Sequence, residues 1–211
     1  MKAQNVSRRD AEVAEGARDI LKRGLVMMKD LVGKARSIRR FDEADPITEE
    51  ALRALVDMAR LSPCGGNAQP LRYRIVFKKE ECDAVFPFLA WAAALKDWSG
   101  PSDGERPTGY VVILGEGGPD INTGIAAQTI QLAAAEMGYG SCMLGSIQRD
   151  NIKATLRIPA PYSVKLVIAL GKPVETVVIE EVSGGTNLNY YRTKDGVHHV
   201  PKLGLKDVLI E

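Results

Sequence analysis

Three arginines and a serine lie within five consecutive residues, at Arg36, Ser37, Arg39 and Arg40. Side chains alternate along an extended chain, so Ser37 and Arg39 share one face while Ile38 and Arg40 share the other. The forked donors of a guanidinium match phosphate oxygens, and a hydroxyl between two such groups can bind a phosphate or a polyol. The segment therefore predicts an anion site, with a solvated basic surface after a helix as the alternative.

A second stretch whose residues could bind a ligand is the loop of residues 62–70. Its two adjacent glycines let a backbone approach a flat ligand closely. Asn67 and Gln69 offer the donors and acceptors that the edge of a heteroaromatic ring requires. A plain glycine and proline turn between a helix and a strand is the alternative. Cys64 has no histidine near it in the sequence to activate it, so we interpret it as a passive thiol.

Histidine and cysteine usage excludes several kinds of site. The two histidines, His198 and His199, are adjacent and near the C-terminus, which disfavours a Ser/His/Asp triad and a multi-histidine metal centre. The three cysteines, Cys64, Cys82 and Cys142, contain no C-x-x-C pair, which disfavours a disulfide framework, a zinc site and an iron–sulfur module. This usage fits a reducing compartment.

Charge is distributed unevenly although the formal net charge is only +1. Residues 1–40 carry 11 Lys and Arg against 5 Asp and Glu, so this end could meet nucleic acid, an anionic cofactor or an acidic partner. No apolar run approaches the roughly 18 residues of a membrane span. No apolar region follows Arg8 and Arg9, as a secretory signal would require. A net charge of only +1 indicates no bulk polyanion partner for the chain as a whole. Of the partners that the basic end could meet, we do not expect nucleic acid, and we expect a cytoplasmic protein that binds no membrane.

Hydrophobic periodicity and turn residues indicate one domain, residues 17–211, after a weakly patterned arm of residues 1–16. Thr48, followed by two glutamates, predicts a helix start. The loop of residues 99–108 is rich in glycine and proline, which predicts a mobile lid. Further helices are predicted at residues 17–32 (stopped by Gly33), 83–98 (interrupted at Pro87), 121–137 (capped by Asp120) and 148–156. Strands are predicted at residues 73–77, 110–114, within 138–146 and at 163–170, before a weakly periodic tail from residue 182. Mixed elements without strict alternation predict an α+β fold with one mixed sheet.

Taken together, four ordered stretches resemble the flavin-dependent nitroreductase family. Residues 36–41 are similar to its N-terminal phosphate-binding motif, and residues 62–70 to its S-P-S-x-x-N-x-Q-P-W loop. Residues 138–145, with the strand and turn of 167–173, resemble its third flavin loop, and residues 190–202 resemble the tail of many members. The resemblance implies a mainly antiparallel sheet flanked by helices, in an intertwined homodimer with FMN held noncovalently between the subunits.

The same resemblance implies a role for each matching position. Arg36 and Arg39 would bind the FMN phosphate, and Ser37 the ribityl chain. Lys202 would reach the phosphate from the tail. The flavin ring would be lined by Pro63, Cys64, Gly65 and Asn67, from the other subunit, and by Met143, Leu144 and Gly145. No side chain is assigned a catalytic role, because the flavin carries the chemistry, and no metal is expected.

The function implied is transfer of hydride from NADH or NADPH to FMN and then to a nitroaromatic, quinone or similar small acceptor, by a ping-pong mechanism. Dehalogenation or flavin degradation on the same fold is an alternative, as is a binding protein in which the flavin is structural. The sequence departs from the family pattern at Ala35, where many members have an arginine, at Cys64, at Leu71, and in a shorter segment 78–108. That segment forms much of the substrate pocket in the family.

Overall fold

The computed structural model describes residues 21, 23–116 and 121–210, so the arm of residues 1–16 and the cap at Asp120 lie outside the described residues. The chain divides into two units, residues 1–34 and residues 35–211. Residues 23–34 of the first unit are helical. The prediction that Gly33 stops this helix was wrong by one residue, because Gly33 does not take the left-handed backbone of a helix-ending glycine.

An antiparallel sheet is the centre of the second unit. Strand β5 pairs with β1, β3 and β4, and β3 also pairs with β2, all antiparallel. A smaller sheet in the tail holds β6, β8 and β7, in which β6 and β8 are parallel. The expected α+β fold with a mainly antiparallel sheet flanked by helices is confirmed. The expectation of one mixed sheet was wrong, because the larger sheet is antiparallel throughout and the parallel pair lies in a separate sheet of the tail. The strand bounds are β1 Phe41–Asp42, β2 Leu71–Val76, β3 Gly109–Gly115, β4 Gly140–Leu144, β5 Ser163–Pro173, β6 Val177–Val182, β7 Tyr191–Arg192 and β8 His198–Leu203.

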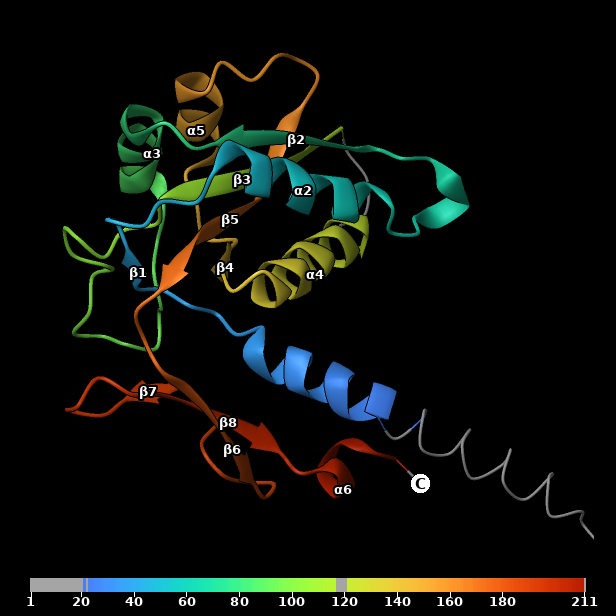
Figure 1. Ribbon diagram of the computed structural model, residues 1–211, viewed down its shortest axis with the longest axis vertical. Coiled ribbons are helices and arrows are strands. Elements are labelled where there is room, and N and C mark those ends of the chain that lie inside the picture. Colours follow the sequence, from blue (N-terminus) through green and yellow to red (C-terminus); the bar gives the residue numbers. More distant parts are fainter. Residues whose placement is uncertain (1–20, 22, 117–120, 211) are drawn as a thin grey trace, which may run out of the picture. The chain divides into compact units, whose positions relative to one another are not determined.

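Helices cover both faces of the larger sheet (Figure 1). Alternation along β3 explains the two layers: Val111 and Ile113 pack toward α2 and α4, whereas Val112 and Leu114 pack toward the other helical layer. Many of the small residues of α4 are used in this core, since Ala126, Ala127 and Ala134 are buried in the same cluster as α2. The helix bounds are α2 Glu49–Arg60, α3 Lys79–Val85, η2 Phe86–Phe88, α4 Ile121–Glu136, α5 Arg149–Thr155 and α6 Leu205–Val208.

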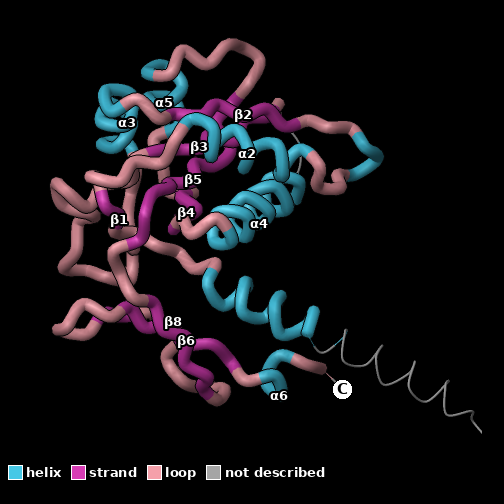
Figure 2. The backbone as a smooth tube through the Cα atoms, viewed as in Figure 1, coloured by secondary structure: helices cyan, strands magenta, loops and turns pink. Residues whose placement is uncertain are grey.

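The predicted start of α2 is confirmed, because the Thr48 hydroxyl accepts a hydrogen bond from the backbone nitrogen of Ala51 at 3.1 Å. The helix predicted at residues 83–98 is confirmed in its interruption at Pro87 but not in its continuation beyond that residue. It begins earlier, as α3, and gives way to a 3-10 turn containing Pro87. Residues 89–98 continue without helix, as Figure 2 shows, and Leu89 forms a bridge to Ile147.

The tail has more structure than its sequence pattern predicts. Residues 177–203 form a three-stranded sheet in which β6 pairs with β8, twenty-one residues further along the chain. Most of its side chains are at least partly exposed. With little burial on either face, such strands carry no clean alternation of apolar and polar residues, so periodicity alone could not reveal them.

Candidate functional site

The segment of residues 36–39 lies against the start of β4. The backbone nitrogen of Ile38 donates to the carbonyl of Ser141 at 2.8 Å, and Ser37 forms a parallel bridge with Ser141. Cys142 is 1% exposed, and burial raises the pKa of its thiol to about 11, while Arg39 and the Ser37 hydroxyl act in the opposite direction. The fold therefore brings the predicted phosphate motif next to the third predicted flavin loop.

Gly140 makes this close approach possible. A Cβ atom placed there would lie 2.7 Å from Cγ2 and 2.9 Å from Cβ of Ile38. We expect Gly140→Ala to lower the free energy of unfolding by about 1–3 kcal/mol, the usual cost of overpacking. Urea unfolding measures this change. Gly145→Ala is the matched control, because its added atom would lie 3.9 Å from the nearest neighbour, Leu166. Equal losses in both variants would contradict the proposed close packing.

Arg39 is buried, 8% exposed, and contacts the tail. Its Nη1 donates to the carbonyl of Ser37 at 3.2 Å and lies 3.3 Å from Nε2 of His198. Its guanidinium carbon lies 4.9 Å from the centre of the Tyr190 ring. Within the described residues, Nε of Arg39 is enclosed and has no hydrogen-bond acceptor. The protein thus binds Arg39 through Nη1, whereas the Nε donor of Arg39 has no hydrogen-bond partner among the described residues.

A buried carboxylate organises the same region. Glu175 has no exposed side-chain surface, and it accepts hydrogen bonds from the backbone nitrogen of Arg39 and, at 2.7 Å, from Nη2 of Arg192. The Arg192 guanidinium lies 4.7 Å from the centre of the Trp98 ring. The hydroxyl of Tyr190 accepts from the backbone nitrogen of Ala94 at 3.3 Å. These contacts fasten the tail sheet to residues 36–39 and to residues 94–98.

Arg40 points to a different part of the molecule, as the alternation predicts. Its guanidinium forms a two-pronged ion pair with Glu105, with Nε to Oε2 at 2.8 Å. Oε1 of Glu43 accepts from the backbone nitrogens of Gly104 and Arg106, each at 2.9 Å. The loop of residues 99–108 is therefore anchored by backbone and side-chain bonds, and its role as a mobile lid stays a prediction.

Arg36 and Ser37 precede these contacts on the same segment. Both residues are partly exposed, and the carbonyl of Arg36 accepts from Nε2 of the buried Gln131 at 3.5 Å. No ion pair joins the Arg36 side chain to a carboxylate among the residues that the structure describes. Its charge is therefore available to an anion, in contrast to that of Arg40.

The strand β4 ends with Met143 and Leu144, and Gly145 follows it directly. Leu144 is buried in the layer with α3 and α5, while Met143 faces the opposite layer and is partly exposed. Gly145 is exposed, and its carbonyl accepts from Nη2 of Arg149 at 3.1 Å. This end of β4 offers backbone groups and an open glycine, four positions along the chain from Ser141, which contacts residues 37–38.

The loop of residues 62–70 lies elsewhere on the single chain. It follows the C-terminus of α2, whereas residues 36–42 precede the N-terminus, and twelve helical residues span about 18 Å. Backbone φ is positive at Gly66, Asn67 and Gln69, so the loop is tightly wound. In the described chain no hydrogen bond links it to residues 36–39. The structure does not unite Pro63, Cys64, Gly65 and Asn67 with Arg39 in one subunit.

The loop borders a cavity of about 330 Å³ between α2, β2 and α4. Sγ of Cys64 accepts from the backbone nitrogen of Gln69 at 3.2 Å, and Oδ1 of Asn122 accepts from that of Gly65 at 3.4 Å. Cys64 therefore helps to hold the loop, in agreement with the interpretation of a passive thiol.

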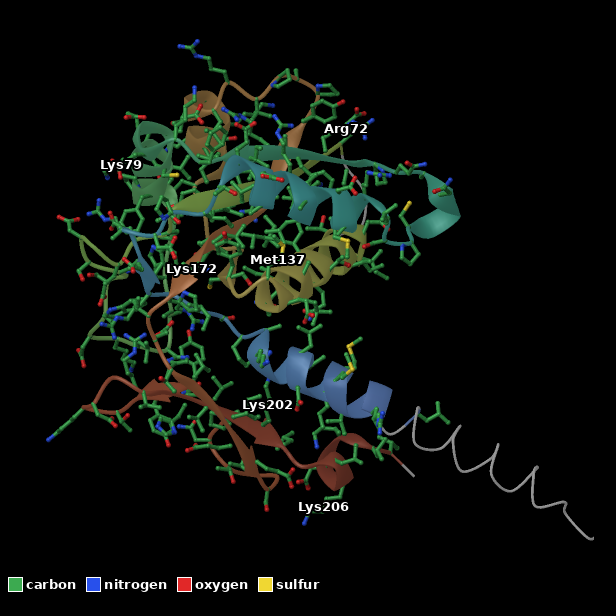
Figure 3. The ribbon with its side chains drawn as sticks, in the orientation of Figure 1. Arg72, Lys79, Met137, Lys172, Lys202 and Lys206 are labelled. Carbon is green, nitrogen blue, oxygen red and sulfur yellow. The ribbon has the colours of Figure 1, made fainter. Side chains whose placement is uncertain are left out.

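Lys202 is exposed on β8, and Figure 3 shows it on the tail sheet. It lies four positions after His198, or about 13 Å along a strand. Within one chain it therefore does not join Arg39, and its contact with a phosphate stays a prediction.

Three residues of this region were missed by sequence reasoning: Glu175, Arg192 and His198. Each acts through a partner distant in sequence. The resemblance of residues 190–202 to a family tail includes Arg192 and His198, whereas no sequence signal pointed to Glu175. Among the described residues no helix is long and apolar enough to span a membrane, and no group of three or more His, Cys, Asp or Glu could hold a metal ion.

Comparison with known proteins gives a consistent result. A sequence model described as the nitroreductase family matches residues 32–102 and 115–172, more than half of the chain. YodC of Bacillus subtilis is 22% identical to this chain over 180 residues, and the match covers 69% of this chain and 89% of YodC. Its name gives NAD(P)H nitroreductase as a provisional function.

Solved structures share the fold. A nitroreductase family protein from Clostridium novyi NT aligns with a TM-score of 0.58 and 23% identity, covering 69% of this chain and 84% of that one. An FMN-dependent nitroreductase from Clostridium difficile R20291 aligns with a TM-score of 0.53 and 23% identity, covering 68% of this chain and 87% of that one. At these identities the likeness establishes the fold alone.

Proposed function

Because the chain belongs to the nitroreductase family, we propose that it is an FMN-dependent oxidoreductase that uses NADH or NADPH to reduce a nitroaromatic, quinone or similar small acceptor. The observation that carries this proposal is the junction of residues 36–39 with the start of β4. This junction sets the cationic donors of Arg36 and Arg39 at the start of β4, the strand after which the exposed Gly145 follows. A phosphate joined to a flat ring system requires charged donors at one end of its site and an accessible backbone at the other. The FMN dependence of one protein with the same fold adds support.

The residues present fit an FMN phosphate. The dianion needs charged donors, and Arg36 has no described carboxylate partner while Nε of Arg39 has no described acceptor. Ser37 lies between them with its side chain beside Cys142. We assign Arg36, Ser37 and Arg39 to the phosphate and ribityl chain. One compact anion site, without a dinucleotide-binding glycine fingerprint in the sequence, favours FMN over FAD.

FMN, when bound, supplies the redox chemistry, so the chain needs to bind, orient and shield it. The partly exposed Met143 would present apolar surface to the ring, and Gly145 would leave its backbone accessible. The side chain of Leu144 is buried in the core, so Leu144 would line the ring only through its backbone. No side-chain nucleophile or proton donor is assigned. Donor and acceptor would occupy the same face of the ring in turn, since no Rossmann fingerprint provides a second nicotinamide site.

We infer that two copies of the chain complete the site. The loop of residues 62–70 cannot reach residues 36–39 of its own chain by a hydrogen bond, so Pro63, Cys64, Gly65 and Asn67 would line the flavin of the partner subunit. Large apolar side chains are also exposed within residues 35–211, on α4 and after β8: Ile121, Leu205, Leu209 and Ile210. Exposed apolar groups of this number favour burial in a dimer.

Sedimentation measures the association directly. We expect a dimer of the 22.9 kDa chain that carries one FMN per subunit. A monomer that still holds stoichiometric FMN would contradict the shared site, because the loop would then be dispensable for binding.

Identification of the bound cofactor tests the proposed function. We expect the purified protein to be yellow, and heat to release a compound that elutes with FMN in chromatography. Recovery of FAD would overturn the assignment of a single phosphate site. A colourless protein that takes up no added FMN would overturn the function, and retention of that protein on DNA at moderate salt would favour the alternative of a binding protein.

A further inference from the structure

The orientation of Arg39 depends on a residue of the tail. Nη1 of Arg39 is the atom that meets both protein acceptors, the carbonyl of Ser37 at 3.2 Å and Nε2 of His198 at 3.3 Å. Nε and Nη2 have no acceptor among the described residues, and Nε is fully enclosed. These two nitrogens form the side-on fork of the guanidinium, which matches the spacing of two oxygens of a carboxylate or phosphate. The protein thus binds the guanidinium through Nη1 and provides no acceptor for the edge formed by Nε and Nη2.

His198 is suited to this role only as a neutral imidazole. It is 1% exposed, and its pKa is lowered to about 4 by burial and, to a lesser extent, by the nearby charges of Arg39, Arg192 and His199. A neutral ring at ordinary pH can accept at Nε2, which places its proton on Nδ1. No described residue accepts from Nδ1. The buried ring therefore leaves Nδ1 without a hydrogen-bond partner while Nε2 holds Arg39. An apolar side chain at this position would not carry the cost of that unpaired polar atom.

We propose that His198 is a positioning residue that orients Arg39 for the phosphate of FMN, and that it thereby couples docking of the tail sheet to cofactor binding. This inference rests on the proposed function. His198 is the first residue of β8, so it meets Arg39 only when the tail sheet is docked. Coupling between two binding events is reciprocal. If docking of the tail raises the affinity for FMN by some factor, bound FMN must raise the equilibrium constant for docking by the same factor.

Two polar substitutions separate positioning from packing. The amide oxygen of His198→Gln can reach the position of Nε2 and accept from Arg39, whereas that of His198→Asn reaches only the position of Nδ1. We expect His198→Gln to bind FMN nearly as the natural protein does. We expect His198→Asn to raise the dissociation constant for FMN about tenfold, the effect of losing a hydrogen bond to a charged group. Equilibrium dialysis with FMN measures both values.

His199→Asn is the matched control. His199 is the next residue, partly exposed, and its Nδ1 lies 2.6 Å from Oε1 of Glu180 instead of facing Arg39. We expect this variant to bind FMN unchanged. A loss in His199→Asn equal to that in His198→Asn would mean that disturbance of the tail alone explains the effect, and would overturn the positioning role.

Hydrogen exchange of the β8 amides gives a second readout. In the natural protein and in His198→Gln, added FMN should slow exchange across residues 198–203. In His198→Asn it should slow exchange much less. If FMN does not change exchange in the natural protein, the coupling is refuted, even if His198→Asn fails to fold. If the natural protein binds FMN and His198→Asn binds it equally well, only this inference fails. If the natural protein binds no FMN, the proposed function fails with it.

Discussion

Replacing Glu175 with alanine is expected to lower the free energy of unfolding by about 3–5 kcal/mol, the usual cost of removing one partner from a buried ion pair. Glu175 has no exposed side-chain surface, and it accepts from the backbone of Arg39 and from the guanidinium of Arg192. Its loss would leave the largely enclosed Arg192, whose side chain is 16% exposed, without its carboxylate partner. Urea unfolding at fixed protein concentration measures the change.

Two variants provide the comparison. Glu175→Gln keeps an acceptor of similar shape without the charge, so its loss should be intermediate. Glu180→Ala removes a glutamate of the same tail whose side chain is 34% exposed and pairs with His199. Exposed pairs contribute about 0–1 kcal/mol, so this variant should unfold nearly as the natural protein does. A loss in Glu175→Ala as small as that in Glu180→Ala would contradict the account of a buried organising carboxylate.

Arg39→Ala is expected to weaken FMN binding by about ten- to a hundredfold, because a hydrogen bond to a charged group contributes roughly 1.5–3 kcal/mol. Arg40→Ala should change FMN affinity little, since the Arg40 guanidinium pairs with Glu105 on the other side of the segment. Its main effect should be a looser loop at residues 99–108. FMN titration of both variants measures the difference, and equal losses would refute the assignment of the two arginines to different faces.

Much of the core could be predicted from the sequence. The Thr48 cap, the apolar strand β3 and the long helix α4 are set by local patterns, in which neighbouring residues specify the element. The junction of residues 36–39 with β4 was implied by the family resemblance, and the bridge between Ser37 and Ser141 agrees with it. The separation of Arg39 from Arg40 followed from simple alternation.

The remaining features depend on contacts between distant residues. Glycine and proline in residues 99–108 indicate a loop, but they do not reveal that Glu43 and Arg40 fix it. Glu175 and Arg39 are 136 residues apart, and Arg39 and His198 are 159 apart. No periodicity encodes such pairs. For the same reason the tail sheet, with its exposed strands and parallel pairing of β6 and β8, was not predicted.

Separate anaerobic half-reactions test the central claim most directly. NADH or NADPH is added to the purified protein without an acceptor, and the visible absorbance of the flavin is followed. A quinone or nitroaromatic is then added after the nicotinamide has been removed. We predict that one of the two donors bleaches the bound flavin and that the acceptor restores its colour. A protein that holds FMN but is bleached by neither donor, or that needs donor and acceptor together, would contradict the account.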